Sequence, residues 1–198
     1  MAKTTIDHSE RKRMVVMKAM RLFAQIGFSK VSFREIAEAT GVARTVLYRY
    51  FTTKRDIFDA AISELTQGLG DNIRVICEQR IPATERIDKV CTLVAETFHE
   101  RKEFFAAVCD YVFSMVNAGH DMSERIELFT GKLRVVFAEL IREAIENKEC
   151  KSSLDPENTA DVLYSIMESA AFRMRLGVEK DPEAAKIRFR RAIAAVRI

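Results

Sequence analysis

The stretch from Gly27 to Phe58 has the pattern of two short helices separated by a single glycine. Ser32 and Glu35 have the Ser-x-x-Glu spacing of a capping box, which predicts that a short helix begins there. Gly41 ends this helix, because glycine adopts the left-handed conformation that a tight turn between helices needs. A second short helix is expected from about residue 43 to residue 51. This arrangement predicts a helix-turn-helix.

The next helix has its own start signal. Thr53 and Asp56 repeat the capping spacing, so a helix is expected to begin at Lys54. We expect this helix to continue past Gly68 and Gly70, which weaken it and allow it to bend. The two glycines therefore mark a candidate hinge between two domains.

Apolar residues recur at helical spacing along the whole chain, and no stretch alternates as a half-buried β-strand does. We therefore expect an all-α fold of about nine helices. The first begins near Asp7 and ends at Gly27, and later helices are expected at 84–99, 102–117 and 121–147. The last two are expected to begin at Pro156 and Pro182, with Asp155 and Asp181 as their caps. The predicted domains are a helix-turn-helix domain over residues 1–56 and a larger helical domain over residues 57–198.

Charge is distributed unevenly between these two parts. Residues 1–55 hold twelve Lys or Arg against four Asp or Glu, a net charge of +8, although the whole chain carries only +3. The remaining residues carry a net charge of −5. A basic module joined to an acidic one is typical of a protein that binds DNA with one domain only.

The composition argues against several other classes. No apolar run approaches the length of about 20 residues that a transmembrane helix needs, and we see no secretory signal, so a cytoplasmic location and no membrane partner are expected. Cys77, Cys91, Cys109 and Cys150 are widely spaced, which favours reduced thiols over a disulfide framework or a zinc site. A redox-sensing cysteine is a minority interpretation. We expect no cofactor and no metal.

A family resemblance rests on residues of the helix-turn-helix. They are Gly27-Phe28, Ser32, Ile36-Ala37, Gly41-Val42, Leu47-Tyr48, Tyr50-Phe51 and Lys54. This pattern resembles the N-terminal domain of TetR-type transcriptional regulators over roughly the first sixty residues. The family usually has Ser or Thr where Ala43 stands, so the second short helix lacks a side-chain cap, at a cost of about 1 kcal/mol.

The resemblance implies a set of DNA contacts. The set comprises Ser32, Arg34, Arg44, Thr45, Tyr48, Arg49, Tyr50 and Lys54. Arg44, Thr45 and Tyr48 are expected in the major groove with Arg34, where Arg44 is suited to a bidentate contact with guanine. The other residues, above all Lys54, are expected to hold the sugar-phosphate backbone. Packing of the two tyrosines and solvation of Arg34 are the alternatives for single residues.

One recognition helix covers few base pairs, so such modules normally act as homodimers on palindromic sites of double-stranded DNA. In TetR-like proteins the last two helices pair with those of a second subunit. The residues expected there are Leu163, Tyr164, Met167, Ala170, Ala171, Met174, Ile187 and Ile193. The alternative is that these faces only close the core of the monomer.

The larger domain of TetR-like proteins encloses a pocket for a small molecule. Here the candidate polar residues for such a pocket are His99, Cys109, Tyr111, Asn117, His120 and Glu168. The Phe and Met content suits a small hydrophobic or aromatic effector, although any helical core uses the same residues. The resemblance implies a ligand-responsive repressor that its effector releases from the operator.

Two rival interpretations remain. Glu96 and His99 have the Glu-x-x-His spacing of di-iron enzymes, but a working site needs a second such pair and the chain has none. The other alternative is an adaptor that keeps the fold without binding DNA. The absence of other catalytic motifs favours a regulator over a helical-bundle enzyme.

Overall fold

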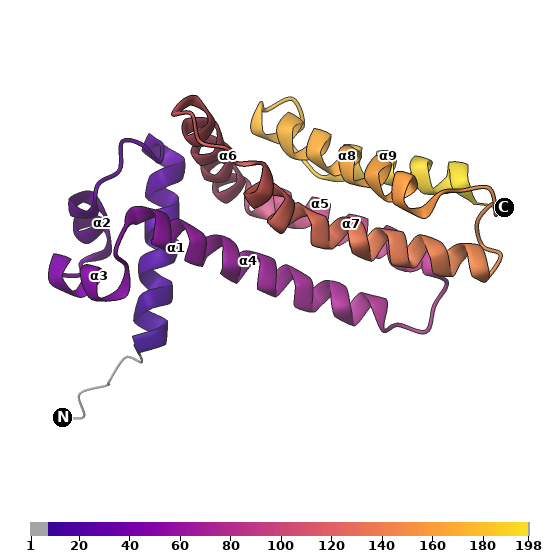
Figure 1. Ribbon diagram of the computed structural model, residues 1–198, viewed down its shortest axis with the longest axis horizontal. Coiled ribbons are helices and arrows are strands. Elements are labelled where there is room, and N and C mark those ends of the chain that lie inside the picture. The colour runs from indigo at the N-terminus through magenta and orange to yellow at the C-terminus, as the bar shows by residue number, and fades with distance from the viewer. Residues whose placement is uncertain (1–7, 198) are drawn as a thin grey trace. The chain divides into compact units, whose positions relative to one another are not determined.

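The computed structural model describes residues 8–197, except the side chains of Arg125, Leu128, Phe129 and Arg175. The helices within this range are α1 (His8–Ile26), α2 (Phe33–Thr40), α3 (Arg44–Tyr50), α4 (Lys54–Cys77), α5 (Ala83–Glu100), α6 (Lys102–Asn117), α7 (Ser123–Glu146), α8 (Pro156–Arg175) and α9 (Glu183–Val196) (Figure 1). Over this range the chain forms no strand, only an isolated antiparallel bridge between Cys150 and Arg197. The predicted all-α fold is confirmed.

The ends of the helices follow the sequence signals closely. Asp155 caps α8 by accepting a hydrogen bond from the Asn158 backbone N–H at 2.8 Å, with Pro156 in the first helical turn. At α9 the helix begins one residue later than expected, because Pro182 itself occupies the cap position. The predicted start of α1 near Asp7 lies outside the described residues.

The chain divides into two compact units. The first comprises residues 1–67 with 106–120, and the second comprises residues 68–105 with 121–198. The first boundary falls between Gln67 and Gly68, inside an unbroken α4. Most of α6 belongs to the first unit, although it follows residue 57 in the sequence. The assignment of DNA binding to residues 1–56 and of effector binding and dimerisation to residues 57–198 stays a prediction.

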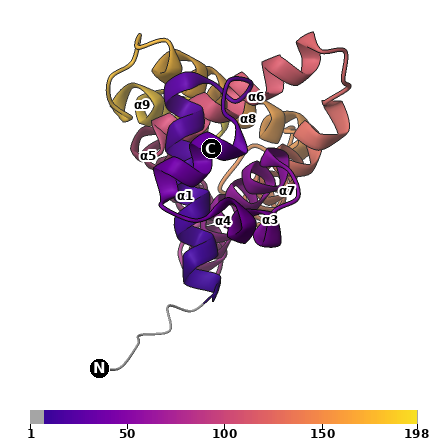
Figure 2. The same cartoon turned by 90° about the vertical axis from the view of Figure 1, so that its left-hand side faces the viewer.

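Aromatic side chains form much of the core of the first unit. Phe23 on α1, Phe28 in the following turn and Phe58 on α4 pack with ring centroids 5.2–6.0 Å apart. Figure 2 labels the helices α1 and α4 that carry two of these residues. Tyr111 of α6 adds a fourth ring, 4.7 Å from Phe28 and 4.4 Å from Phe58. Each such ring contributes about 1.5–3 kcal/mol by burial, so this cluster joins α1, α4 and α6 firmly.

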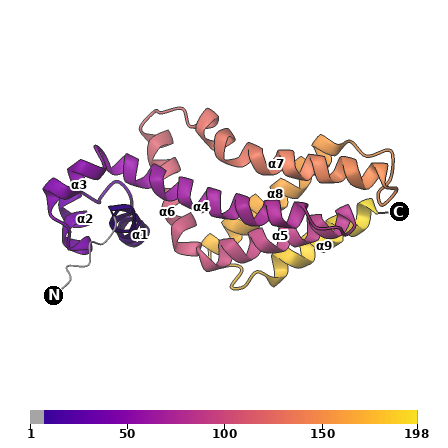
Figure 3. The same ribbon diagram turned by 90° about the horizontal axis from the view of Figure 1, so that it is seen from below.

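The second unit is a helical bundle in which α5 and α9 lie side by side and α7 runs along α8 (Figure 3). Its core contains Val90 and Val94 of α5, Phe137 of α7, Met167 of α8 and Phe189 of α9, all at most 2 % exposed. No helix in the described part of the chain is long and apolar enough to span a bilayer.

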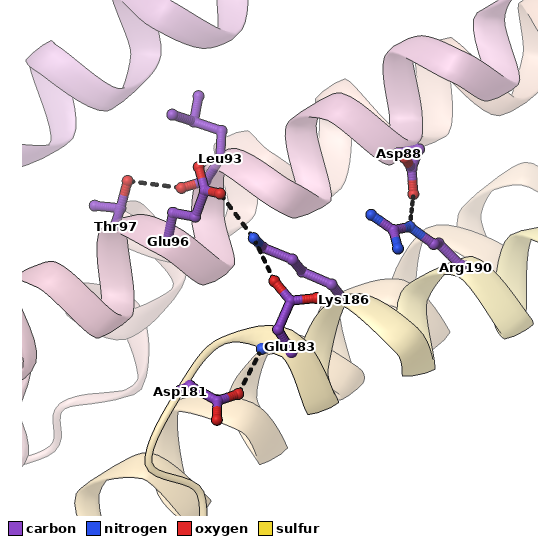
Figure 4. Close-up of polar contacts among 8 residues, drawn as sticks. All are labelled: Asp88, Leu93, Glu96, Thr97, Asp181, Glu183, Lys186 and Arg190. Carbon is purple, nitrogen blue, oxygen red and sulfur yellow. Dashed lines mark hydrogen bonds and ion pairs between the residues drawn. The ribbon is translucent and has the colours of Figure 1, made fainter.

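Ion pairs align α9 with α5. Lys186 donates to Glu96 on α5 at 2.8 Å and to Glu183 on its own helix at 2.9 Å (Figure 4). One turn further along α9, the Arg190 guanidinium lies 3.7 Å from Asp88. The carboxylates of Glu96 and Glu183 raise the pKa of Lys186. These pairs fix the register of α9 and therefore decide which of its faces reaches solvent.

The two basic residues of this contact are expected to differ in their effect on stability. Lys186→Ala should lower the free energy of unfolding by about 1–2 kcal/mol, because Lys186 is mostly buried and donates two charge-assisted hydrogen bonds. Arg190→Ala, which removes an exposed and longer pair, should cost less than about 0.5 kcal/mol. Urea unfolding of the two variants measures the difference, and equal losses would contradict the assignment.

Candidate nucleic-acid interface

The first short helix of the motif is capped as the sequence predicts. The Ser32 backbone N–H donates to the Glu35 carboxylate at 2.6 Å, and the Glu35 backbone N–H donates to the Ser32 hydroxyl oxygen at 3.4 Å. These backbone and hydroxyl hydrogen bonds from Ser32 lower the pKa of Glu35. Gly41 then ends the helix in the left-handed conformation, with φ of 70°. The Ser32 hydroxyl therefore serves the cap both as an acceptor from the Glu35 N–H and as a donor to the Glu35 carboxylate.

The start of α4 uses a second reciprocal cap. The Asp56 carboxylate accepts from the backbone N–H groups of Thr52 and Thr53 at 2.9 and 2.8 Å, and the Thr53 hydroxyl accepts from the Asp56 N–H at 3.2 Å. The backbone hydrogen bond from Thr53 is the main cause that lowers the pKa of Asp56. Since α3 ends at Tyr50, the caps of α2 and α4 fix the segments on both sides of it.

The helix α3 presents its polar side chains to solvent. Its cap position is Ala43, which forms no side-chain hydrogen bond, as expected from the sequence. Arg44 and Thr45 are exposed, and within the described chain neither forms a hydrogen bond or ion pair with another residue. Leu47, on the opposite side of α3, is fully buried. The helix is therefore anchored by one face and displays the other.

Tyr48 is not a packing residue of the core. It is 58 % exposed, and its ring stacks on Phe33 of α2 with a centroid distance of 4.7 Å and an interplanar angle of 2°. Phe33, at the start of α2, is half-buried and supports the Tyr48 ring. Arg34, next to Phe33, is exposed and lies 3.6 Å from Glu38.

Tyr50 and Arg49 lie at the other end of α3. The Tyr50 hydroxyl is 2.9 Å from Nδ1 of His8, the first described residue of α1. The Arg49 guanidinium lies over the Tyr50 ring, 5.9 Å from its centroid. No local sequence signal identifies His8 as a partner of Tyr50, because the two residues are 42 positions apart.

Lys54 has a structural role that the sequence analysis missed. Its ammonium donates to the carbonyl oxygens of Phe28, Ser29 and Val31 at 2.7, 3.1 and 3.0 Å. An ammonium has only three protons to donate, so these contacts use all of them. Burial lowers the pKa of Lys54. Its contact with a DNA phosphate stays a prediction, and such a contact would have to replace a bond to this loop.

The same loop is held from its other side by α6. The Phe28 backbone N–H donates to the Asp110 carboxylate at 2.7 Å, and the hydroxyls of Ser29 and Ser114 are 2.6 Å apart. Gly27 has φ of +88°, and a β-carbon at this position would lie 3.3 Å from the Asp110 carboxylate. The turn after α1 therefore requires glycine both for its conformation and for the approach of Asp110.

The residues predicted to bind an effector are divided between the two units. Cys109, Tyr111, Asn117 and His120 lie in the first unit, and His99 and Glu168 lie in the second. Tyr111 is only 1 % exposed, and its hydroxyl has no hydrogen-bond partner within the described residues. Asn117, His120 and Glu168 are exposed, whereas His99 and Cys109 are half-buried. Their role in ligand binding stays a prediction.

A small pocket of about 40 Å³ lies within the second unit. Its lining is mostly apolar and includes Ile87, Ile141, Cys150, Leu163 and Val196. None of the six predicted effector residues lines it. Burial is the main cause that raises the pKa of Cys150, so this thiol stays protonated at neutral pH.

Half of the residues predicted at the subunit interface are buried within their own chain. Leu163, Met167, Ala170 and Ile193 are at most 5 % exposed and belong to the core of the second unit. This is the alternative that the sequence left open for those four positions. Tyr164, Ala171 and Met174 are half-buried, and Ile187 is 45 % exposed. Burial, with the nearby Glu168 carboxylate, raises the pKa of Tyr164 to about 12.

The Glu-x-x-His pair does not extend into a metal site in the described part of the chain. Glu96 binds Lys186, and no group of three or more His, Cys, Asp or Glu side chains among the described residues is placed to hold a metal ion.

Comparison with known proteins agrees with this geometry. Residues 16–61 match the family of bacterial regulatory proteins described as the tetR family. The transcriptional regulator PksA of Bacillus subtilis is 25 % identical over 177 residues, covering 86 % of this chain and 82 % of PksA. The transcriptional regulator AcrR of Shigella flexneri is 40 % identical over 65 residues, which cover 33 % of this chain and 30 % of AcrR.

A solved structure extends the likeness of the fold to nearly the whole chain. A TetR transcription regulator from Haloarcula marismortui superposes with a TM-score of 0.82 over 96 % of this chain and 100 % of that one, at 18 % identity. Over residues 16–61 the chain matches the tetR family of bacterial regulatory proteins, and the matched segment contains the helix-turn-helix with the exposed face of α3. Over nearly its whole length the chain has the fold of TetR-like transcriptional regulators.

The role of Lys54 in the loop can be tested by stability. Lys54→Ala should lower the free energy of unfolding by about 1–3 kcal/mol, because three carbonyl oxygens lose a charged donor. Arg55→Ala removes a neighbouring exposed charge and should change stability by less than about 0.5 kcal/mol. Thermal unfolding followed by circular dichroism compares them. An unchanged Lys54→Ala variant would show that the loop does not need the ammonium.

Proposed function

We propose that this protein represses transcription by binding a palindromic operator as a homodimer, and that a small hydrophobic or aromatic effector releases it. The observation that carries the proposal is the exposed face of α3. Arg44, Thr45 and Tyr48 project from this helix without a hydrogen bond or ion pair in the described chain, although both flanking segments are fixed by caps. A rigid helix with unpartnered polar groups is suited to reading base edges.

Arg49, Tyr50 and the Ser32 hydroxyl are the proposed phosphate contacts. The Arg49 guanidinium and the Ser32 side chain are exposed, and the Tyr50 hydroxyl can donate to a phosphate when His8 donates to its oxygen. By contrast, Lys54 is committed to the loop between α1 and α2. We assign Lys54 mainly to holding that loop and treat its phosphate contact as secondary. The cytoplasmic location expected from the sequence agrees with action on the chromosome.

The second copy is proposed to pack against the solvent face of α8. Val162, Phe172 and Leu176 are 57 %, 56 % and 60 % exposed, and Ser165 and Ser169 lie between them at helical spacing. Large apolar residues separated by small ones allow helices to approach closely. The exposed Ile187 of α9 is assigned to the same interface. This set replaces the four predicted interface residues that lie in the core.

A binding protein is favoured over an enzyme. Glu96 of the Glu-x-x-His pair is held by Lys186, and the described residues provide no cluster for a metal. The effector is proposed to bind among the helices of the second unit, whose interior is apolar. Release would follow from a shift of population between two arrangements of the DNA-reading domains.

Two arginines of α3 separate sequence reading from phosphate binding. Arg44→Ala should change which base is preferred at one position, at a cost of about 1–3 kcal/mol, because Arg44 is proposed to contact guanine. Arg49→Ala should weaken binding to all sequences and lower its salt dependence. Fluorescence anisotropy with DNA from upstream of the protein's own gene, and with single-base variants of it, measures both effects at several salt concentrations. Identical preference profiles for the two variants would contradict the assignment.

The proposed interface is tested by the oligomeric state. Phe172→Glu should shift the protein from dimer to monomer, because a charge would enter an apolar contact between subunits. Val75→Glu is the control, since Val75 on α4 is 62 % exposed and lies outside the proposed face. Size-exclusion chromatography with light scattering measures the mass. A monomeric wild type, or a dimeric Phe172→Glu variant, would refute this interface.

A further inference from the structure

The hydrogen bond between α1 and α3 has a consequence for DNA binding. Nδ1 of His8 lies 2.9 Å from the Tyr50 hydroxyl, and the two rings meet edge to face with centroids 6.2 Å apart. His8 is exposed and Tyr50 is half-buried, so the pair lies at the surface. Tyr50 is one of the proposed phosphate contacts.

The phenol of Tyr50 has a single proton to donate, and a phosphate diester accepts hydrogen bonds without donating any. If Tyr50 gives its proton to Nδ1 of His8, it has none for a phosphate. If Nδ1 carries a proton, as it does in one neutral tautomer and always in the imidazolium, His8 donates to the phenol oxygen, and the phenol proton is free for the phosphate. The neutral ring therefore allows either direction of the hydrogen bond, whereas the imidazolium always leaves the Tyr50 proton free.

We propose that His8 takes up a proton from solvent when the helix-turn-helix docks on DNA, so that affinity for DNA rises as the pH falls through neutrality. The inference rests on the proposed function, in which Tyr50 binds a phosphate. Histidine is the side chain that changes charge near neutral pH. His8 acts as a positioning residue for Tyr50, and its imidazolium adds a positive charge beside the phosphate backbone.

The charged groups around the His8–Tyr50 pair come from three helices. From α3, the Arg49 guanidinium lies over the Tyr50 ring, and from α1, the Lys12 ammonium lies 5.3 Å from the centroid of the Phe51 ring. Glu10 and Arg11 follow His8 in the first turn of α1. On α4, Glu64 is paired with Arg13.

A DNA phosphate beside the His8–Tyr50 pair favours the imidazolium, because opposite charges attract. More protons are therefore bound in the complex than in the free protein, so acidification strengthens binding.

The test measures binding of a fluorescently labelled duplex of mixed sequence, because phosphate contacts support binding to any sequence. Anisotropy titrations run from pH 8 to pH 6 at constant ionic strength and low salt. Wild-type protein should bind the duplex about three- to tenfold more tightly at pH 6 than at pH 8 for each helix-turn-helix domain that docks. His8→Gln and Tyr50→Phe should each lose most of this gain. The control Lys18→Gln should keep it, since Lys18 is an exposed residue of the same helix and no histidine is removed.

Failure of the proposed role of His8 can be distinguished from failure of the proposed DNA binding. DNA binding by His8→Gln with the wild-type pH profile would overturn the role of His8 and leave the regulator intact. No DNA binding by wild type at any pH would overturn both proposals. Circular dichroism spectra show whether each variant is folded. If Tyr50→Phe keeps the pH dependence that His8→Gln loses, His8 acts as a charge alone and the switch through Tyr50 is wrong.

Discussion

The geometry of the DNA-reading domain depends on how the backbone between α1 and α2 is held. The Lys54 ammonium donates hydrogen bonds to three carbonyl oxygens of this loop, and the Asp110 carboxylate accepts a hydrogen bond from the Phe28 backbone N–H. Two opposite charges from helices far apart in sequence thus satisfy one short loop. Without these partners, the part-buried and exposed backbone groups of the loop would bind water instead and would no longer tie the loop to α4 and α6. The entry angle of α2, and through it α3, follows from this loop.

This loop also explains why α6 belongs to the same compact unit as the helix-turn-helix. Tyr111 packs against Phe28 and Phe58. Its neighbours Asp110 and Ser114 form hydrogen bonds with Phe28 and Ser29 of the turn. A displacement of α6 therefore disturbs both the aromatic cluster and the loop that positions α2. The buried Tyr111 hydroxyl has no partner in the described chain, so the cluster keeps one polar group that a rearrangement could satisfy.

The parts of the structure that could be predicted from sequence are those determined by neighbours within a few residues. The capping box of Ser32 and Glu35, the left-handed Gly41 and the missing cap at Ala43 were all predicted and observed. The role of Lys54 could not be predicted, because its acceptors lie more than twenty positions away. The face of α8 proposed to meet a second subunit could not be predicted for a different reason. Its apolar residues surround the helix, so periodicity alone does not distinguish the side that fills the core from the side that meets a partner.

The short helices α2 and α3 have eight and seven residues, which is below the length at which a helix is stable alone. Their stability must come from Ile36 and Leu47, which are fully buried, and from the caps and the loop. The outward residues Arg44 and Thr45 contribute little to it. Recognition and folding are thus assigned to different faces of the same helix. A lineage that carries this fold can change the base sequence it reads through substitutions that leave the protein as stable as before.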